Sequence, residues 1–72
     1  MIKSLTYKNK EIHKQWAVEV KGNEVFIEFG EINCTGWIDK KTFDNNLLAL
    51  EFANQKIDEK LMKGYREVDE IS

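Results

Sequence analysis

The chain has 72 residues, of which 42% are hydrophobic and 33% charged, and its formal net charge is −2. This length allows one domain with a thin core, because a chain of this size buries only about two-thirds of its unfolded surface. The aromatic and hydrophobic content excludes a disordered chain. The net negative charge provides no global field to attract nucleic acid, so a binding function must be argued from particular residues.

The cysteine count and the hydropathy pattern exclude two further classes. Cys34 is the only cysteine in the sequence, so an internal disulfide is excluded. No apolar run approaches the roughly 18 residues of a membrane-spanning helix. The first ten residues also lack the apolar segment of a secretion signal. We therefore expect a cytoplasmic protein without membrane association.

The predicted elements begin with strands. Residues 2–7 are compatible with an edge strand. Further along, apolar and polar residues alternate with the period of a half-buried strand. The alternation predicts three strands in an antiparallel meander, over residues 15–20, 24–32 and 37–43. Gly22-Asn23 predicts a tight hairpin turn between the first two of these, and residues 33–36 predict a second turn. In the middle strand Phe29 is in phase with Val25 and Ile27, which favours a core position for its ring.

A helix is predicted from Asp44 to about Lys63. Asp44 is a suitable N-cap, because its carboxylate can accept hydrogen bonds from amides of the first turn. Apolar residues at spacings of three and four share a face, namely Leu47, Leu48, Ala49, Phe52, Ala53, Ile57 and Leu61. Glu59 and Lys63 have the spacing of a helical ion pair. Gly64 suits the position after the helix, where a left-handed backbone is needed.

The end of the chain completes a two-layer arrangement. Residues 65–68 predict a short returning strand, and residues 69–72 an acidic tail that frays. One helix beside an antiparallel sheet of about four to five strands is an α+β fold. A single domain then takes up residues 1–72, with its core over about 12–68. We expect the sheet face that the helix leaves uncovered to carry the function.

An ordered set of residues resembles the WGR domain, a module named for a Trp-Gly-Arg tripeptide. The set comprises Trp16, Val18, Val20, Val25, Ile27, Phe29-Gly30, Gly36, Phe43-Asp44, Ala49, Phe52-Ala53, Ile57, Glu59-Lys60, Lys63-Gly64-Tyr65 and Glu67-Val68. The resemblance implies an antiparallel sheet with one packed helix and a non-catalytic role. WGR domains occur in poly(ADP-ribose) polymerases and in bacterial proteins. In the polymerases the module sits at DNA ends, where the Trp stacks on the terminal nucleotide and the Arg contacts the backbone or neighbouring domains.

The chain departs from the family at this tripeptide, which reads Phe29-Gly30-Glu31. A Phe ring can still stack on a base, which contributes about 1–3 kcal/mol. A carboxylate only accepts hydrogen bonds and is repelled by phosphate, unlike the guanidinium of Arg. Gly36 is followed by Trp37. The sequence favours equally two roles for this side chain, as an interface residue or as a cap over the end of the sheet. Glu31 therefore weakens the expectation of DNA binding.

These residues leave two functional hypotheses. No P-loop, dinucleotide, zinc or paired-acid motif is present, so we expect no enzyme activity, no metal and no cofactor. The first hypothesis is a nucleic-acid-associated module, acting on DNA ends or single strands in a DNA-processing system. Its candidate site residues are Phe29, Gly30, Glu31, Trp37, Lys40, Lys41 and Lys14. The alternative is a protein-interaction module of the same fold that has lost DNA binding. The thin core is also compatible with a homodimer, since pairing buries further apolar surface.

Overall fold

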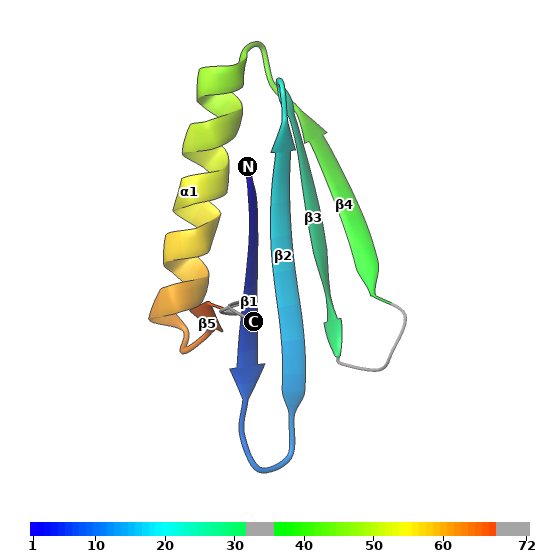
Figure 1. Cartoon of the computed structure of the whole chain (residues 1–72), viewed down its shortest axis with the longest axis vertical. Helices are drawn as coiled ribbons and strands as arrows, with labels where there is room; N and C mark the ends of the chain where they lie inside the picture. The colour runs from blue at the N-terminus through cyan, green and yellow to red at the C-terminus, as the bar shows by residue number, and fades with distance from the viewer. Residues whose placement is uncertain (32–35, 68–72) are drawn as a thin grey trace, which may run out of the picture.

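A computed structural model describes residues 1–31 and 36–67. It shows a five-stranded antiparallel sheet with one helix packed against it, which confirms the predicted α+β fold (Figure 1). The elements are β1 (Ile2–Lys8), β2 (His13–Lys21), β3 (Glu24–Glu31), β4 (Trp37–Thr42), α1 (Asn46–Met62) and β5 (Arg66–Glu67). The spatial order of the strands is β4-β3-β2-β1-β5. The predicted tail over 69–72, and residues 33–35 of the second predicted turn, lie outside the described residues.

The β2–β3 hairpin forms at the predicted turn. Lys21 pairs with Glu24, so Gly22 and Asn23 alone connect the two strands. Gly22 has a φ of +60°, the left-handed conformation that a two-residue hairpin loop requires. The register that follows pairs Trp16 with Phe29 further along the hairpin.

β1 confirms the strand predicted over residues 2–7, but it is not a free edge along its whole length. It pairs with β2 from Ile2 to Lys8 on one side and with β5 at Leu5 and Thr6 on the other. The rings of Tyr7 and Tyr65 lie 5.5 Å apart and hold the returning chain against β1.

The core lies between one sheet face and α1. Its buried residues are Leu5, Trp16, Val18, Val20, Val25 and Ile27 from the sheet, and Ala49, Ala53 and Ile57 from the helix. The helix residues follow a spacing of four, and the two alanines allow its backbone to approach the strands closely. Leu47 and Leu61 of the predicted apolar face remain 64% and 41% exposed. The helix surface in contact with the sheet is therefore narrower than the apolar face predicted from the sequence, because only the row of residues at a spacing of four is buried.

The helix begins one residue later than predicted. The N-cap is Asn45, whose Oδ1 accepts a hydrogen bond from the Leu48 backbone N–H at 2.9 Å. The assignment of Asp44 as N-cap was wrong, because Asn45 is the last residue with extended backbone angles. At the other end Lys63 is the C-cap, and Gly64 follows with a φ of +100°, as predicted.

Along the helix, the ion pair joins Glu59 to Lys56, at 3.3 Å, whereas the sequence suggested Lys63 as its partner. None of the helices in the described residues is long and apolar enough to cross a membrane.

Candidate functional site

The predicted site residues do not share the uncovered sheet face. Cross-strand pairing aligns Trp16, Phe29 and Trp37 in one row across β2, β3 and β4. Residues in register point to the same face of a sheet, and Trp16 is part of the core beneath α1. Phe29 and Trp37 therefore lie on the helix side, and so do Lys14 and Lys41, which pair with Glu31 and Val25. The uncovered face, where the function was expected, therefore does not carry Phe29, Trp37, Lys14 or Lys41.

Their exposure has a simple cause in the packing. α1 lies mainly over β2 and β3 and does not reach across β4. Phe29 is consequently 43% exposed and Trp37 73% exposed. The predicted core position of Phe29 was therefore wrong, although the phase of its strand was right.

Lys40 is the member of the predicted set that points to the other face. Its Nζ lies 2.6 Å from Glu24 Oε2 and 5.8 Å from the centre of the Phe26 ring. Lys40 and Lys41 are neighbours in an extended strand, so their side chains point to opposite faces. The two lysines of the predicted set therefore do not form one basic surface.

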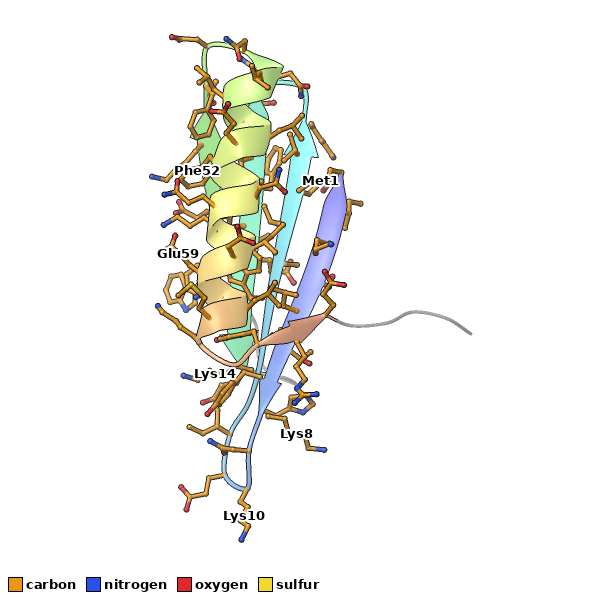
Figure 2. All side chains as sticks on the ribbon, turned by 90° about the vertical axis from the view of Figure 1, so that its left-hand side faces the viewer. Met1, Lys8, Lys10, Lys14, Phe52 and Glu59 are labelled. Carbon is orange, nitrogen blue, oxygen red and sulfur yellow. The ribbon has the colours of Figure 1, made fainter. Side chains whose placement is uncertain are left out.

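An open groove of about 370 Å³ lies between α1 and the outer part of the sheet. Its lining residues are Trp16, Ile27, Phe29, Asp39, Lys41, Phe52, Lys56, Glu59, Lys60 and Lys63. We call it the lysine groove. Lys56, Lys60 and Lys63 follow the i, i+4, i+7 spacing of one helix face, which is the signal that would have identified this wall in the sequence. Figure 2 shows Phe52 and Glu59 on one side of α1, with Lys14 below the last turn of the helix.

The lysines of the groove perturb one another. Partial burial lowers the pKa of Lys60 below its ordinary value, and the positive charge of Lys63 lowers it further. Lys56 and Lys14 act in the same direction more weakly, whereas Glu59 acts against them. The ammonium groups thus crowd one another, and an anion placed among them would relieve the repulsion.

Aromatic rings form the floor and walls of the groove beneath these charges. Lys60 Nζ lies 6.0 Å from the centre of the Trp16 ring and 5.3 Å from that of Tyr65. Lys41 and Lys56 lie 5.4 and 5.5 Å from the centre of the Phe52 ring. Cation–π contacts of this kind hold the lysine stems against the protein and leave the charges at the surface.

A second hollow of about 290 Å³ continues the groove past the end of β3. It is lined by Lys14, Gln15, Phe29, Gly30, Glu31, Lys60 and Tyr65. Phe29 and Lys60 line both spaces, so the two form one continuous surface. Glu31 therefore faces a largely basic neighbourhood.

Within residues 1–31 and 36–67, no three His, Cys, Asp or Glu side chains gather as a metal site would require. The fold and the groove together define a small α+β domain with an open, lysine-lined surface. The chain belongs to the WGR domain family, whose family model matches residues 2–72.

Three similar proteins are bacterial. The chain is 30% identical to YfeS of Escherichia coli over 93% of its length, and 36% identical to YehF of the same organism over 85% of its length. A crystal structure of a Bacteroides fragilis protein superposes with a TM-score of 0.90, at 28% identity over 97% of this chain. The chain spans only 28% of YfeS, 22% of YehF and 20% of the B. fragilis chain. The similarity is thus confined to a part of each of these proteins.

Proposed function

We propose that this WGR domain is a non-enzymatic cytoplasmic module that binds DNA, at ends or in single strands, through the lysine groove. The observation that supports it best is the clustering of lysines around Phe29, an exposed aromatic ring. The WGR domains of poly(ADP-ribose) polymerases sit at DNA ends, and membership of the same family supports the proposal.

The two walls of the groove suit a nucleic-acid backbone. Lys41 extends from β4, while Lys56 and Lys60 extend from α1 on the opposite side and Lys63 from the C-cap of that helix. Phosphates lying along these ammonium groups would release counterions, which is the main source of affinity in such complexes. Phe29 lies between the walls and offers a ring on which a base can stack. The groove can thus attract phosphate although the whole chain is acidic.

Glu31 sets the direction of the path that we propose. It lies across from Lys14 at the end of β3, where its carboxylate repels phosphate. The backbone of the ligand is therefore expected to follow the α1 wall and to keep away from the end of β3. On this basis Glu31→Arg would tighten DNA binding, because it exchanges repulsion for a bidentate phosphate contact.

The test is a titration of fluorescently end-labelled single-stranded and duplex DNA, followed by anisotropy between about 50 and 200 mM salt. The K56Q/K63Q double variant removes two charges from the groove. The K10Q/K21Q double variant removes two charges outside it and serves as the matched control. Each lost phosphate contact lowers the slope of log Kd against log salt by about 0.7 for single strands and about 0.9 for duplex.

Two results would contradict the proposal. One is the absence of salt-sensitive binding at tens of micromolar protein. The other is an equal loss of affinity in K56Q/K63Q and in K10Q/K21Q, which would mean that the groove has no special part in binding.

A second candidate function is a protein-interaction module of the same fold. It is favoured by Trp37 and Ile38, adjacent residues of β4 that are 73% and 70% exposed. The two side chains point to opposite faces of the strand, so each is a separate exposed apolar residue, and tryptophan is enriched among the residues that dominate interfaces. A pull-down from a native host, repeated with Trp37→Ala and with Glu31→Arg, tests this candidate. It fails if both variants retain every partner of the wild-type domain.

A further inference from the structure

β4 is one of the two outer strands of the sheet among the described residues, and the short β5 is the other. β4 pairs with β3 on one side, and no described strand lies on its other side (Figure 1). All six of its residues are exposed. An edge strand of this kind presents a row of unpaired backbone N–H and C=O groups, which can pair with a further strand.

The pairing with β3 determines which backbone groups face outward. The Phe43 backbone N–H donates to the Asn23 carbonyl at 2.8 Å, in line with the β3–β4 register. In an antiparallel pair, alternate residues of a strand bond to the same neighbour. Trp37, Asp39 and Lys41 therefore bond toward β3. The free N–H and C=O groups are those of the residues between them, Ile38, Lys40 and Thr42.

We propose that β4 is a homodimer interface, at which a second copy of this chain adds its own β4 antiparallel to the first. The sheet then continues through a twofold axis, and the two helices lie on the same side of it. Such an isologous contact uses one surface on both copies, and its backbone hydrogen bonds are those of strand addition.

Charge selects one register from those that the backbone allows. The outward groups must pair with each other, so neighbouring registers differ by a shift of two residues. The register centred on Lys40 places Asp39 opposite the partner's Lys41, and this pairing occurs twice. Shifting one way places Asp39 opposite the partner's Asp39, and shifting the other way places Lys41 opposite the partner's Lys41. Opposite charges across a strand pair stabilise it and like charges destabilise it, so only the first register is favoured.

The groups that this register brings together are available for it. Neither Asp39 nor Lys41 makes an ion pair within the described part of the chain. Lys40 faces the partner's Lys40 at the axis, but each is already neutralised by Glu24 at 2.6 Å. Trp37 lies opposite the partner's Phe43, which provides an apolar surface for the most exposed aromatic ring of the described residues.

Among residues 1–31 and 36–67, nothing obstructs access to this edge. α1 packs on β2 and β3 and lies away from β4, so it does not obstruct a strand added at that edge (Figure 1). Asp39 and Lys41 also line the lysine groove, but the dimer is tested by oligomeric state in the absence of DNA, so its failure is distinguishable from a failure of DNA binding.

The test is sedimentation equilibrium over a wide range of concentration, with charge-exchange variants. Asp39→Lys and Lys41→Asp each replace both cross-strand attractions by repulsions. The dissociation constant of the dimer should therefore rise roughly tenfold or more in each variant alone. An equimolar mixture of the two variants restores opposite charges at both positions and should form a heterodimer of near wild-type affinity. The D39K/K41D double variant should recover the homodimer for the same reason. Asp58→Lys, on the exposed side of α1, changes the charge as Asp39→Lys does and should leave dimerisation unchanged.

Wild-type protein that stays monomeric into the hundreds of micromolar would overturn the proposal. Mixed single variants that do not associate, or an Asp58→Lys variant that weakens the dimer as Asp39→Lys does, would overturn the register. Circular dichroism of each variant shows whether it is folded. The mixture of Asp39→Lys with Lys41→Asp provides the decisive result. Each variant alone carries a substitution that weakens its own homodimer, so association of the two with each other must come from the restored charge pairs.

Discussion

Gly64 is the residue whose replacement is expected to affect the fold most directly at the end of α1. Its φ of +100° lies in the region that residues with a Cβ rarely adopt. This conformation reverses the chain, so that Tyr65 packs against Tyr7 and β5 can pair with β1. It therefore also holds the last turn of the helix, which carries Lys60 in the lysine groove.

The cost of Gly64→Ala can be worked out from three contributions. A left-handed backbone costs a non-glycine residue about 1–2 kcal/mol, and the lower entropy of the unfolded chain returns about 0.4–1 kcal/mol. An added Cβ would also lie 3.2 Å from Tyr7 Cε2, closer than ordinary van der Waals contact, so the ring must move. We expect a net loss of about 1–1.5 kcal/mol in the free energy of unfolding, or roughly 4–12 °C in Tm.

The measurement is urea and thermal unfolding followed by circular dichroism. Gly22→Ala is the matched control, because Gly22 also has a positive φ of +60° but an added Cβ there would meet nothing within 4 Å. Gly22→Ala should therefore cost less than Gly64→Ala, and the difference measures the Tyr7 contact. A Gly64→Ala variant that unfolds at the wild-type temperature would refute the reasoning, and so would a larger loss in Gly22→Ala.

Three further predictions test the helix cap and the groove. Asn45→Ala should lower the free energy of unfolding by about 1 kcal/mol, because it removes the acceptor of the Leu48 N–H. Asp44→Ala is the control and should change stability little. Equal losses of the two variants in urea unfolding would contradict the assignment of Asn45 as N-cap. Phe29→Ala should weaken single-stranded DNA binding roughly tenfold by anisotropy if the exposed ring stacks on a base, and an unchanged Kd would exclude stacking there. The pKa of Lys60 is lower in the folded state than its ordinary value, so the charged side chain destabilises the fold, and this cost is complete at neutral pH. The cost falls as pH rises from the folded-state pKa toward the ordinary pKa, because Lys60 loses its proton in the folded state first. Urea unfolding of Lys60→Met should therefore gain on wild type at neutral pH and lose that gain in alkali, whereas a pH-independent difference would argue against the shift.

The sequence indicated the local features correctly where short-range chemistry decides them. The alternation of Val25 and Ile27 identified β3, and Gly22-Asn23 identified its hairpin. Gly64 marked the end of the helix, because a left-handed position requires the missing Cβ. The N-cap was misplaced by one residue, since Asp44 and Asn45 have equivalent capping chemistry and backbone angles alone distinguish them.

The candidate site was only partly accessible from the sequence, because exposure depends on where α1 lies. Phe29 has the phase of a core residue, yet it is exposed because the helix does not extend over β4. Lys56 and Lys60 were absent from the predicted site residues, because only the fold places them opposite Lys41. By itself the sequence determined the strand phases, the turns, the helix and the family frame, since these depend on neighbouring residues. Only the tertiary structure decided which side of the sheet carries the lysine groove and which strand is left as a free edge, because both follow from the packing of one helix on a wider sheet.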